Sequence, residues 1–168
     1  QLAGFLKNLH GIDTTGAPLP GAHNYERGAS LRVYDVDTRG YMKALSGLID
    51  SRAASALWEE ATHTEWQHAP LWVHGDFAGG NIVVKDGVLA GAIDFGCMAA
   101  GDPACDLVIA WTFLQGKSRE TFIRQMNMDA ATLARAKGWA LWKACFMLVH
   151  SKDHTIREDQ MRLVEALG

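Results

Sequence analysis

The sequence predicts an α+β domain that is mostly helical and has one small β hairpin. Three observations lead to this prediction. Apolar residues recur at helical spacing along much of the chain. One strong hairpin signal, Lys85-Asp86-Gly87, separates two short β-rich runs. The chain of 168 residues, 48% apolar and 21% charged, suits one folded domain.

The first third of the chain predicts three helices and one long loop. Apolar residues at helical spacing up to Gly11 predict a helix over 2–10. Closely spaced Pro and Gly residues then predict a loop to about residue 30. Two further helices are expected at about 37–49 and 51–64. Their candidate N-caps are Asp37, Asp50 and Ser51.

The middle of the chain predicts the hairpin. Residues 71–74 form a short strand that enters a glycine-containing loop, and strands are expected at 81–84 and 88–94. Asp94 ends the return strand, so its carboxylate is expected to lie beside the loop at 77–80.

After the hairpin the pattern is helical. Asp102 is expected to cap a helix that has Pro103 in its first position. The stretch from 139 to 149 predicts a core helix, since it is too short to span a bilayer and contains Lys143. Other predicted start signals are the caps Ser118 and Asp129 and a capping box of Thr155 with Glu158.

The residues around the hairpin suit the transfer of a phosphoryl group. That reaction needs a carboxylate at the acceptor hydroxyl, and an amide and a second carboxylate for magnesium, at these intervals. The run consists of His74-Gly75-Asp76, Asn81, Asp94-Phe95-Gly96, Gly101-Asp102-Pro103 and Asp106.

This run resembles the aminoglycoside phosphotransferase and choline kinase-like family, small-molecule relatives of protein kinases. The resemblance lies in His-Gly-Asp-x-x-x-x-Asn, Ile-Asp-Phe-Gly and Gly-Asp-Pro-Ala-x-Asp-Leu. Gly75 stands where protein kinases usually have arginine, which favours the small-molecule branch. The resemblance implies the C-terminal lobe of a protein kinase-like fold. It also implies Asp76 as catalytic base, Asn81 and Asp94 as Mg²⁺ ligands, and His74 and Asp106 as supports of the loop.

The first 75 residues contain no Gly-x-Gly-x-x-Gly, and their only lysines, Lys7 and Lys43, lie in helical patterns. We therefore expect residues 1–168 to be the C-terminal lobe of a larger kinase, with the N-terminal nucleotide-binding lobe absent from this chain. That lobe is the expected partner, and self-association through the uncovered face is a second possibility. The chain alone is expected to be inactive.

The expected activity is transfer of a phosphoryl group from ATP or GTP to a hydroxyl of a small molecule, an aminoglycoside or an amino-alcohol. Macrolide, sugar and homoserine acceptors stay open, and so does a non-catalytic binding module of the same fold. No substrate-binding residue is predicted, although Asp153, Glu158 and Asp159 on the last helix are candidates, as are Trp111 and Trp142 at the cleft.

Composition excludes other classes of protein. A net charge of −3 gives no reason to expect nucleic acid as a partner, and no stretch suggests a membrane segment. The three cysteines lack metal-ligand spacing and suit a reducing cytoplasm.

Overall fold

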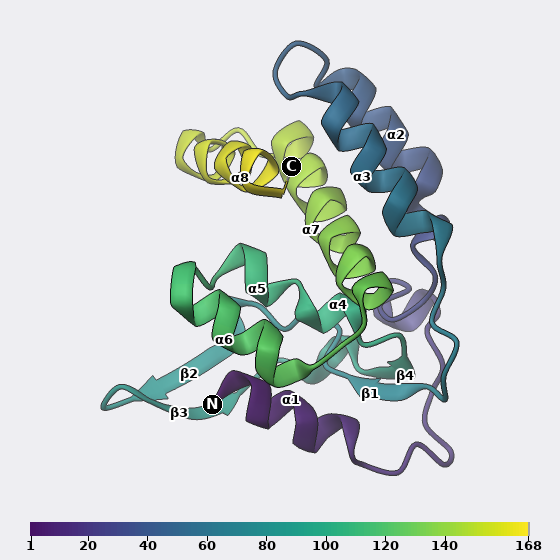
Figure 1. Ribbon diagram of the computed structural model, residues 1–168, viewed down its shortest axis with the longest axis vertical. Helices are drawn as coiled ribbons and strands as arrows, with labels where there is room; N and C mark the ends of the chain where they lie inside the picture. The colour runs from purple at the N-terminus through teal and green to yellow at the C-terminus, as the bar shows by residue number, and fades with distance from the viewer. Residues whose placement is uncertain (168) are drawn as a thin grey trace.

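The computed structural model describes residues 1–167 and confirms the predicted mostly helical α+β architecture (Figure 1). The helices are α1 (Leu2–His10), α2 (Asp35–Ala44), α3 (Ser51–His63), α4 (Ala104–Leu107), α5 (Ile109–Thr112), α6 (Gly116–Met126), α7 (Ala130–His150) and α8 (His154–Leu167). The strands are β1 (Leu71–Val73), β2 (Ile82–Lys85), β3 (Val88–Ala92) and β4 (Ala99–Gly101).

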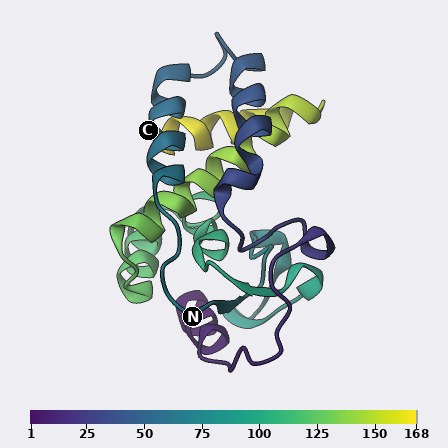
Figure 2. The same ribbon diagram turned by 90° about the vertical axis from the view of Figure 1, so that its right-hand side faces the viewer.

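Helix α7 forms the centre of the fold. It contacts α2, α3, α4 and α8, and the two views at right angles show it running diagonally through the molecule (Figures 1 and 2). Trp139, Leu141 and Leu148 are almost fully buried on it. Asp129 accepts a hydrogen bond from the Thr132 N–H (2.6 Å), so it is the predicted N-cap. No helix among residues 1–167 is long and apolar enough to cross a bilayer.

The strands form two separate antiparallel ribbons. β2 pairs with β3 as predicted, and the tight turn at Asp86 (φ 52°) and Gly87 (φ 76°) has the positive angles of a type I′ hairpin. β1 pairs with β4, a partner that the sequence did not predict, with Leu71 opposite Gly101. The ends of β1 and β3 meet beside α4, since His74 after β1 contacts the Ile93 carbonyl after β3 and its N–H donates to Asp106 of α4.

Several predicted boundaries are wrong. α2 begins at Asp35 and ends at Ala44, so Asp37 lies inside its first turn, whereas the Asp50 cap of α3 is confirmed. Pro103, not Asp102, stands at the N-cap of α4. The capping residues of the last helices also differ. Ser118 and Thr155 lie inside α6 and α8, and Asp153 accepts the Ile156 N–H at the start of α8, where a Thr155–Glu158 box was expected.

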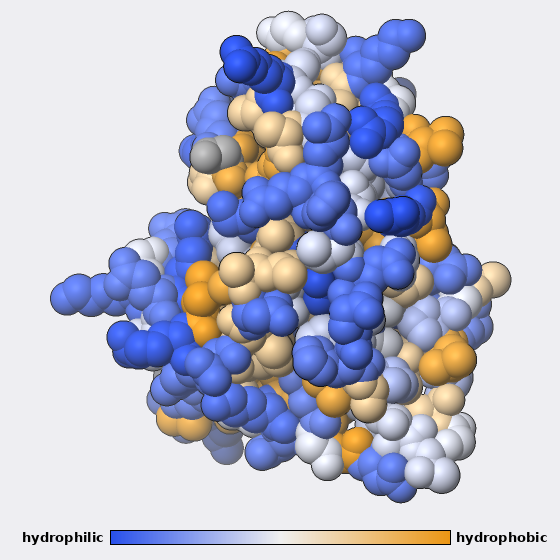
Figure 3. Space-filling model, turned by 45° about the vertical axis from the view of Figure 1, so that its right-hand side comes forward, coloured by the Kyte–Doolittle hydropathy of each residue, from blue (hydrophilic) through white to orange (hydrophobic). Residues whose placement is uncertain are grey.

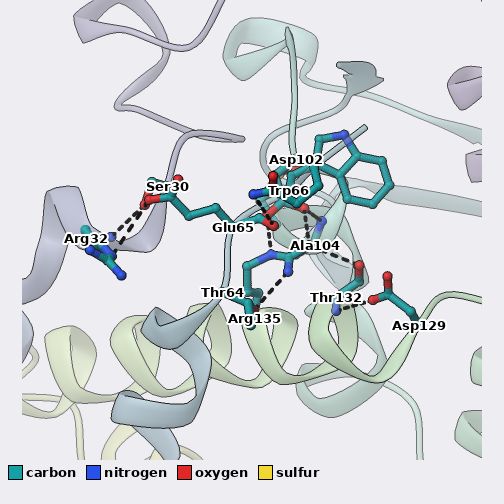
Figure 4. Close-up of polar contacts among 12 residues, drawn as sticks. Ser30, Arg32, Thr64, Glu65, Trp66, Asp102, Ala104, Asp129, Thr132 and Arg135 are labelled. Carbon is teal, nitrogen blue, oxygen red and sulfur yellow. Dashed lines mark hydrogen bonds and ion pairs between the residues drawn. The ribbon is translucent and has the colours of Figure 1, made fainter. Parts of the chain in front are cut away.

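Asp102 belongs to a buried ion pair that joins β4 to α7 (Figure 4). Arg135 Nε donates to Asp102 Oδ2 at 2.6 Å, and the two side chains are 3% and 6% exposed. The guanidinium also donates to the hydroxyls of Thr64 and Thr132, and Asp102 Oδ1 accepts from the Ala104 N–H. Because both charges are paired and hydrogen-bonded, this contact fixes the start of α4 against the central helix.

Candidate active site

The carboxylate of Asp106 holds the backbone of the loop that carries Asp76. Asp106 is fully buried in α4, and its two carboxylate oxygens accept the N–H groups of His74 (2.7 Å) and Gly75 (2.9 Å). Burial raises the pKa of Asp106 to about 7, although these two backbone donors oppose that rise. A carboxyl group placed in this way fixes the path of the chain at the end of β1.

His74 links the same loop to the return strand of the hairpin. Its Nε2 lies 2.9 Å from the Ile93 carbonyl oxygen, and its Nδ1 accepts the Asp76 N–H at 3.3 Å. These partners assign the tautomer with the proton on Nε2. Burial lowers the pKa of His74, which keeps the ring neutral and capable of both bonds. The ring also contacts Phe77 and Phe95.

Gly75 is required by the backbone geometry. Its φ is +80°, and a Cβ at this position would lie 2.1 Å from the Cys97 carbonyl oxygen. The loop can therefore pass this close to the segment after Asp94 only with glycine at position 75. The arginine of protein kinases does not fit here.

Asp76 is held at both carboxylate oxygens. Asn81 Nδ2 donates to Oδ2 (3.1 Å) and to the Asp76 carbonyl (2.8 Å), and Lys143 Nζ lies 3.0 Å from Oδ1. Burial alone would raise the pKa of Asp76, but the charge and hydrogen bond of Lys143, with smaller contributions from Arg27 and Asn81, hold it below its usual value. Asp76 is therefore ionised at neutral pH, with its two oxygens directed to different partners.

Asp94 lies two residues beyond β3, in the left-handed region with φ 64°. The prediction that it ends the return strand is therefore wrong by two residues, because the ladder stops at Ala92. Asp94 nevertheless lies near the Asp76 loop, since both carboxylates act electrostatically on His74 and on Cys97. No hydrogen bond from the described residues reaches the Asp94 carboxylate.

Asn81 and Asp94 fit a magnesium ion by their donor chemistry. Mg²⁺ prefers oxygen ligands and needs few from the protein because it retains several waters. The Asn81 amide nitrogen is occupied by Asp76, which leaves its Oδ1 without a partner among residues 1–167. In the same part of the chain no three His, Cys, Asp or Glu side chains cluster as a metal site.

Two cations beside Asp76 were not predicted from the sequence. Lys143 comes from α7, and the signal that could have pointed to it was a lysine inside the otherwise apolar stretch 139–149. Arg27 comes from the segment that was predicted only as a loop, which the fully buried Asn24 ties to the Cys97 carbonyl (3.2 Å). Both cations line one pocket with Asp76 and Trp142.

Of the tryptophans and acids that were candidate substrate residues, only Trp142 lines the pocket that contains Asp76. Trp142 lies in this pocket, whereas Trp111 is buried and lines a different one. The three acids of the last helix are engaged elsewhere: Asp153 caps α8, Glu158 lies beside His154, and Asp159 pairs with Arg162. A larger apolar pocket of about 370 Å³ between α3, α7 and α8 contains none of the motif residues.

Comparison with known proteins agrees with this architecture. A family model described as "Phosphotransferase enzyme family" matches residues 1–142. The chain is 33% identical over 125 residues to an aminoglycoside 3'-phosphotransferase of Escherichia coli, covering 68% of this chain and 42% of that protein.

Solved structures share the fold. The streptomycin–ATP–APH(2'')-IIa ternary complex has a TM-score of 0.51 at 18% identity, covering 98% of this chain and 59% of that one. The gentamicin–APH(2'')-IIa complex has a TM-score of 0.50 at 19% identity, with the same coverage. These likenesses show the protein kinase-like fold. The chain thus spans about two-fifths of its curated relative and three-fifths of these structures.

The family match covers the Asp76 loop, the hairpin, Asp94 and Asp106, the same residues that the structure brings together. The chain therefore belongs to the phosphotransferase enzyme family of aminoglycoside phosphotransferase-type kinases.

Proposed function

We propose that this chain is the catalytic lobe of an ATP-dependent kinase that phosphorylates a hydroxyl group of a small molecule. The observation that carries the proposal is the ionised Asp76, held between Asn81 and Lys143 at a loop that also lies near Asp94. Family membership supports it, and so do the relatives named as aminoglycoside kinases.

Asp76 acts as the general base in this proposal. Its carboxylate accepts the proton of the acceptor hydroxyl as the acceptor oxygen bonds to the γ-phosphorus and the bond to the departing nucleotide diphosphate breaks. Each carboxylate oxygen has two acceptor positions, so the hydroxyl can bind while Lys143 and Asn81 remain in place. Positioning and electrostatics supply most of the rate enhancement in this type of reaction.

Asn81 and Asp94 are the proposed holders of Mg²⁺. When bound, the ion would neutralise charge on the nucleotide phosphates. His74 and Asp106 act through the backbone of the loop: Asp106 fixes two N–H groups, and His74 ties the Asp76 N–H to the hairpin. Neither residue needs to touch the substrate for this role.

The nucleotide-binding lobe is proposed to pack on the hairpin. Val84, Val88 and Ile93 there are more than half exposed, and Phe95 is 40% exposed. Such apolar side chains are typical of a surface that another element covers. On the face in Figure 3, hydrophilic residues dominate and apolar residues occur in separate patches. Self-association through the uncovered hairpin face remains the second proposed partner. We place this ATP-dependent kinase in the cytoplasm.

The test is Asp76→Asn in the complete protein, assayed for magnesium-dependent transfer from ATP to a panel of aminoglycosides, amino-alcohols, macrolides and sugars. We expect turnover to fall by about 10²–10⁴-fold, as for other positioned acid–base groups, with the melting temperature little changed. A variant that retained more than about a tenth of the wild-type rate would exclude Asp76 as the base.

The same assay separates a kinase from a non-catalytic binding module. A binding module would bind an acceptor from the panel without transferring phosphate. That result in the wild-type protein, with the nucleotide lobe present and magnesium supplied, would overturn the enzymatic proposal.

A further inference from the structure

We propose that Arg27 and Lys143 form a cationic pair beside Asp76 that determines which acceptors can react. The hydroxyl that reaches Asp76 is then flanked by neutral or anionic substituents and not by an ammonium group. This inference rests on the proposed function, because it concerns the acceptor of the same reaction.

The first step is that Asp76 has two distinct sides. Its Oδ2 faces Asn81, which belongs with Asp94 to the proposed metal side, whereas its Oδ1 faces Lys143. The acceptor must approach the base from a direction that the metal and the nucleotide do not occupy. The Lys143 side is therefore the acceptor side.

Lys143 occupies the place that a substrate ammonium would take. Its Nζ lies 3.0 Å from Asp76 Oδ1, and both side chains are 37% exposed, so solvent reaches the pair. An acceptor with an ammonium next to its reacting hydroxyl would bring a second cation to a carboxylate whose charge is already balanced. Like charges at such a distance repel, and the repulsion is stronger where water is partly excluded.

Arg27 adds a cation with no partner acid among residues 1–167. Its guanidinium lies over the ring of Trp142 at 4.5 Å and that of Trp139 at 5.5 Å. In the described residues no hydrogen-bond partner reaches its buried Nε. Asn24 holds the Arg27 carbonyl oxygen at 2.9 Å, which fixes the segment that presents it. An anionic group on the acceptor would satisfy this guanidinium.

The remaining acids do not offset these cations. Asp94 lies on the metal side, and Asp106 lies beneath the loop with its oxygens occupied by backbone N–H groups. Among the described residues that line the pocket, Asp76 is the only acid. With Arg27 and Lys143 each contributing one positive charge, the lining has a net positive charge.

The pocket is also small. Its free volume of about 20 Å³ is enough for about one water molecule. Only the reacting hydroxyl fits in this space, and the substituents next to it are the part of the acceptor nearest to the two cations. Their charge should therefore affect binding more than the rest of the acceptor does.

The experiment compares three probes of matched shape on the complete protein at neutral pH: glucose, glucosamine and glucuronate. Their dissociation constants are measured by calorimetry in the presence of ATP analogue and magnesium, and kcat/KM is measured with ATP. We expect the amine to be at least about tenfold poorer than the neutral sugar, a difference of about 1.4 kcal/mol. The Lys143→Met variant should narrow this difference to about twofold, whereas Lys143→Arg should preserve it.

Lys152→Met is the matched control, because this exposed lysine follows α7 and removes the same charge away from the pocket. It should leave the discrimination unchanged. Equal or tighter binding of the amine, or no difference among the three probes, would overturn the inference. So would a uniform loss of kcat for all three in Lys143→Met. Discrimination in binding without any phosphate transfer would instead refute the proposed function, and the selection by charge would then hold for binding alone.

Discussion

Replacing Arg135 with methionine should destabilise the fold severely, because it leaves the Asp102 carboxylate buried without its counter-ion. Arg135 is 2% exposed and Asp102 5% exposed, so water does not replace the lost partner. The substitution removes the 2.6 Å bond to Asp102 Oδ2 and the bonds to the Thr64 and Thr132 hydroxyls (Figure 4). Breaking a buried pair from one side costs about 3–5 kcal/mol, a large part of the about 5–15 kcal/mol that stabilises a typical domain.

The pair also predicts how this loss depends on pH. Burial raises the pKa of Asp102 even with Arg135 beside it, and the pKa should rise further in Arg135→Met. A carboxyl group whose pKa is higher in the folded than in the unfolded state destabilises the fold as pH rises through that interval. The loss of unfolding free energy in Arg135→Met, relative to wild type, should therefore be largest at neutral pH and should become smaller as the solution is acidified.

Urea unfolding of the chain, followed by circular dichroism, measures both effects. The control is the double variant Asp102→Leu with Arg135→Met, which replaces the ion pair with apolar groups of similar size. We expect the double variant to lie within about 2 kcal/mol of wild type, since replacing a buried ion pair with apolar groups is often neutral or stabilising. That gain offsets the other contacts that are lost, which are those of Asp102 with the Ala104 N–H and of Arg135 with the Thr64 and Thr132 hydroxyls. If Arg135→Met cost less than about 1 kcal/mol, or the double variant were as unstable as the single one, the buried-charge explanation would be wrong.

Three further predictions concern a pair of glycines, one histidine and a pair of aspartates. Gly138→Ala should destabilise the fold by about 1–3 kcal/mol, because its Cβ would lie 2.5 Å from Ala61 Cβ in the core. Gly4→Ala, with nothing within 4 Å, should instead stabilise α1 by about 0.5–1 kcal/mol. Urea midpoints that moved in the same direction for both variants would contradict this contrast. Burial lowers the pKa of His10 to about 4, so the unfolded state takes up a proton at a higher pH than the folded state. The free energy of unfolding should therefore fall by up to about 3 kcal/mol as pH drops from about 6.5 to 4. In unfolding curves measured across this range, His10→Phe should remove that part of the acid sensitivity. In the complete protein, Asp94→Asn should weaken magnesium-supported ATP binding at least about tenfold, or about 1.4 kcal/mol. Asp86→Asn at the hairpin tip is the control, since Asp86 also has a positive φ, and it should leave ATP binding unchanged. Equal losses of affinity in calorimetry would mean that Asp94 is not the metal ligand.

Local patterns in the sequence were enough to predict the hairpin and the main helices. The hairpin turn is defined by two adjacent residues, and the caps Asp50 and Asp129 act within three residues of their own position. The caps that were wrong, such as Ser118, have the right residue type, but α6 begins two residues earlier, at Gly116, with Gln115 at its N-cap and no side-chain cap. Local signals therefore predicted which elements exist better than where they begin.

The long-range contacts of the site were beyond local patterns. Lys143 is 67 residues from Asp76, and Asn24 is 73 residues from Cys97. No spacing rule connects such pairs, because they meet only after α7 and the early loop have packed on the catalytic loop. The proximity of Asp76, Asn81 and Asp94 could be predicted from their spacing, since these residues lie on one hairpin and its entry loop. The two cations that face Asp76 come from other parts of the chain.

The aspartates between 76 and 106 show why a count of charges along the sequence misleads about the site. This stretch contains five aspartates and one lysine, a balance that by itself would favour a pocket for cations. In the fold, Asp86 lies at the hairpin tip, Asp102 is paired with Arg135, and Asp106 serves the loop backbone from its buried position. Asp76 is balanced by Lys143, so of the aspartates close to the Asp76 loop only Asp94 has a carboxylate that no described residue engages. Close to the Asp76 loop, the unbalanced negative charge therefore lies on the proposed metal side, whereas the lining of the proposed acceptor side has the opposite sign. Substrate charge in this family should accordingly be inferred from the groups that face the base in three dimensions, including those supplied by α7 and by the early loop.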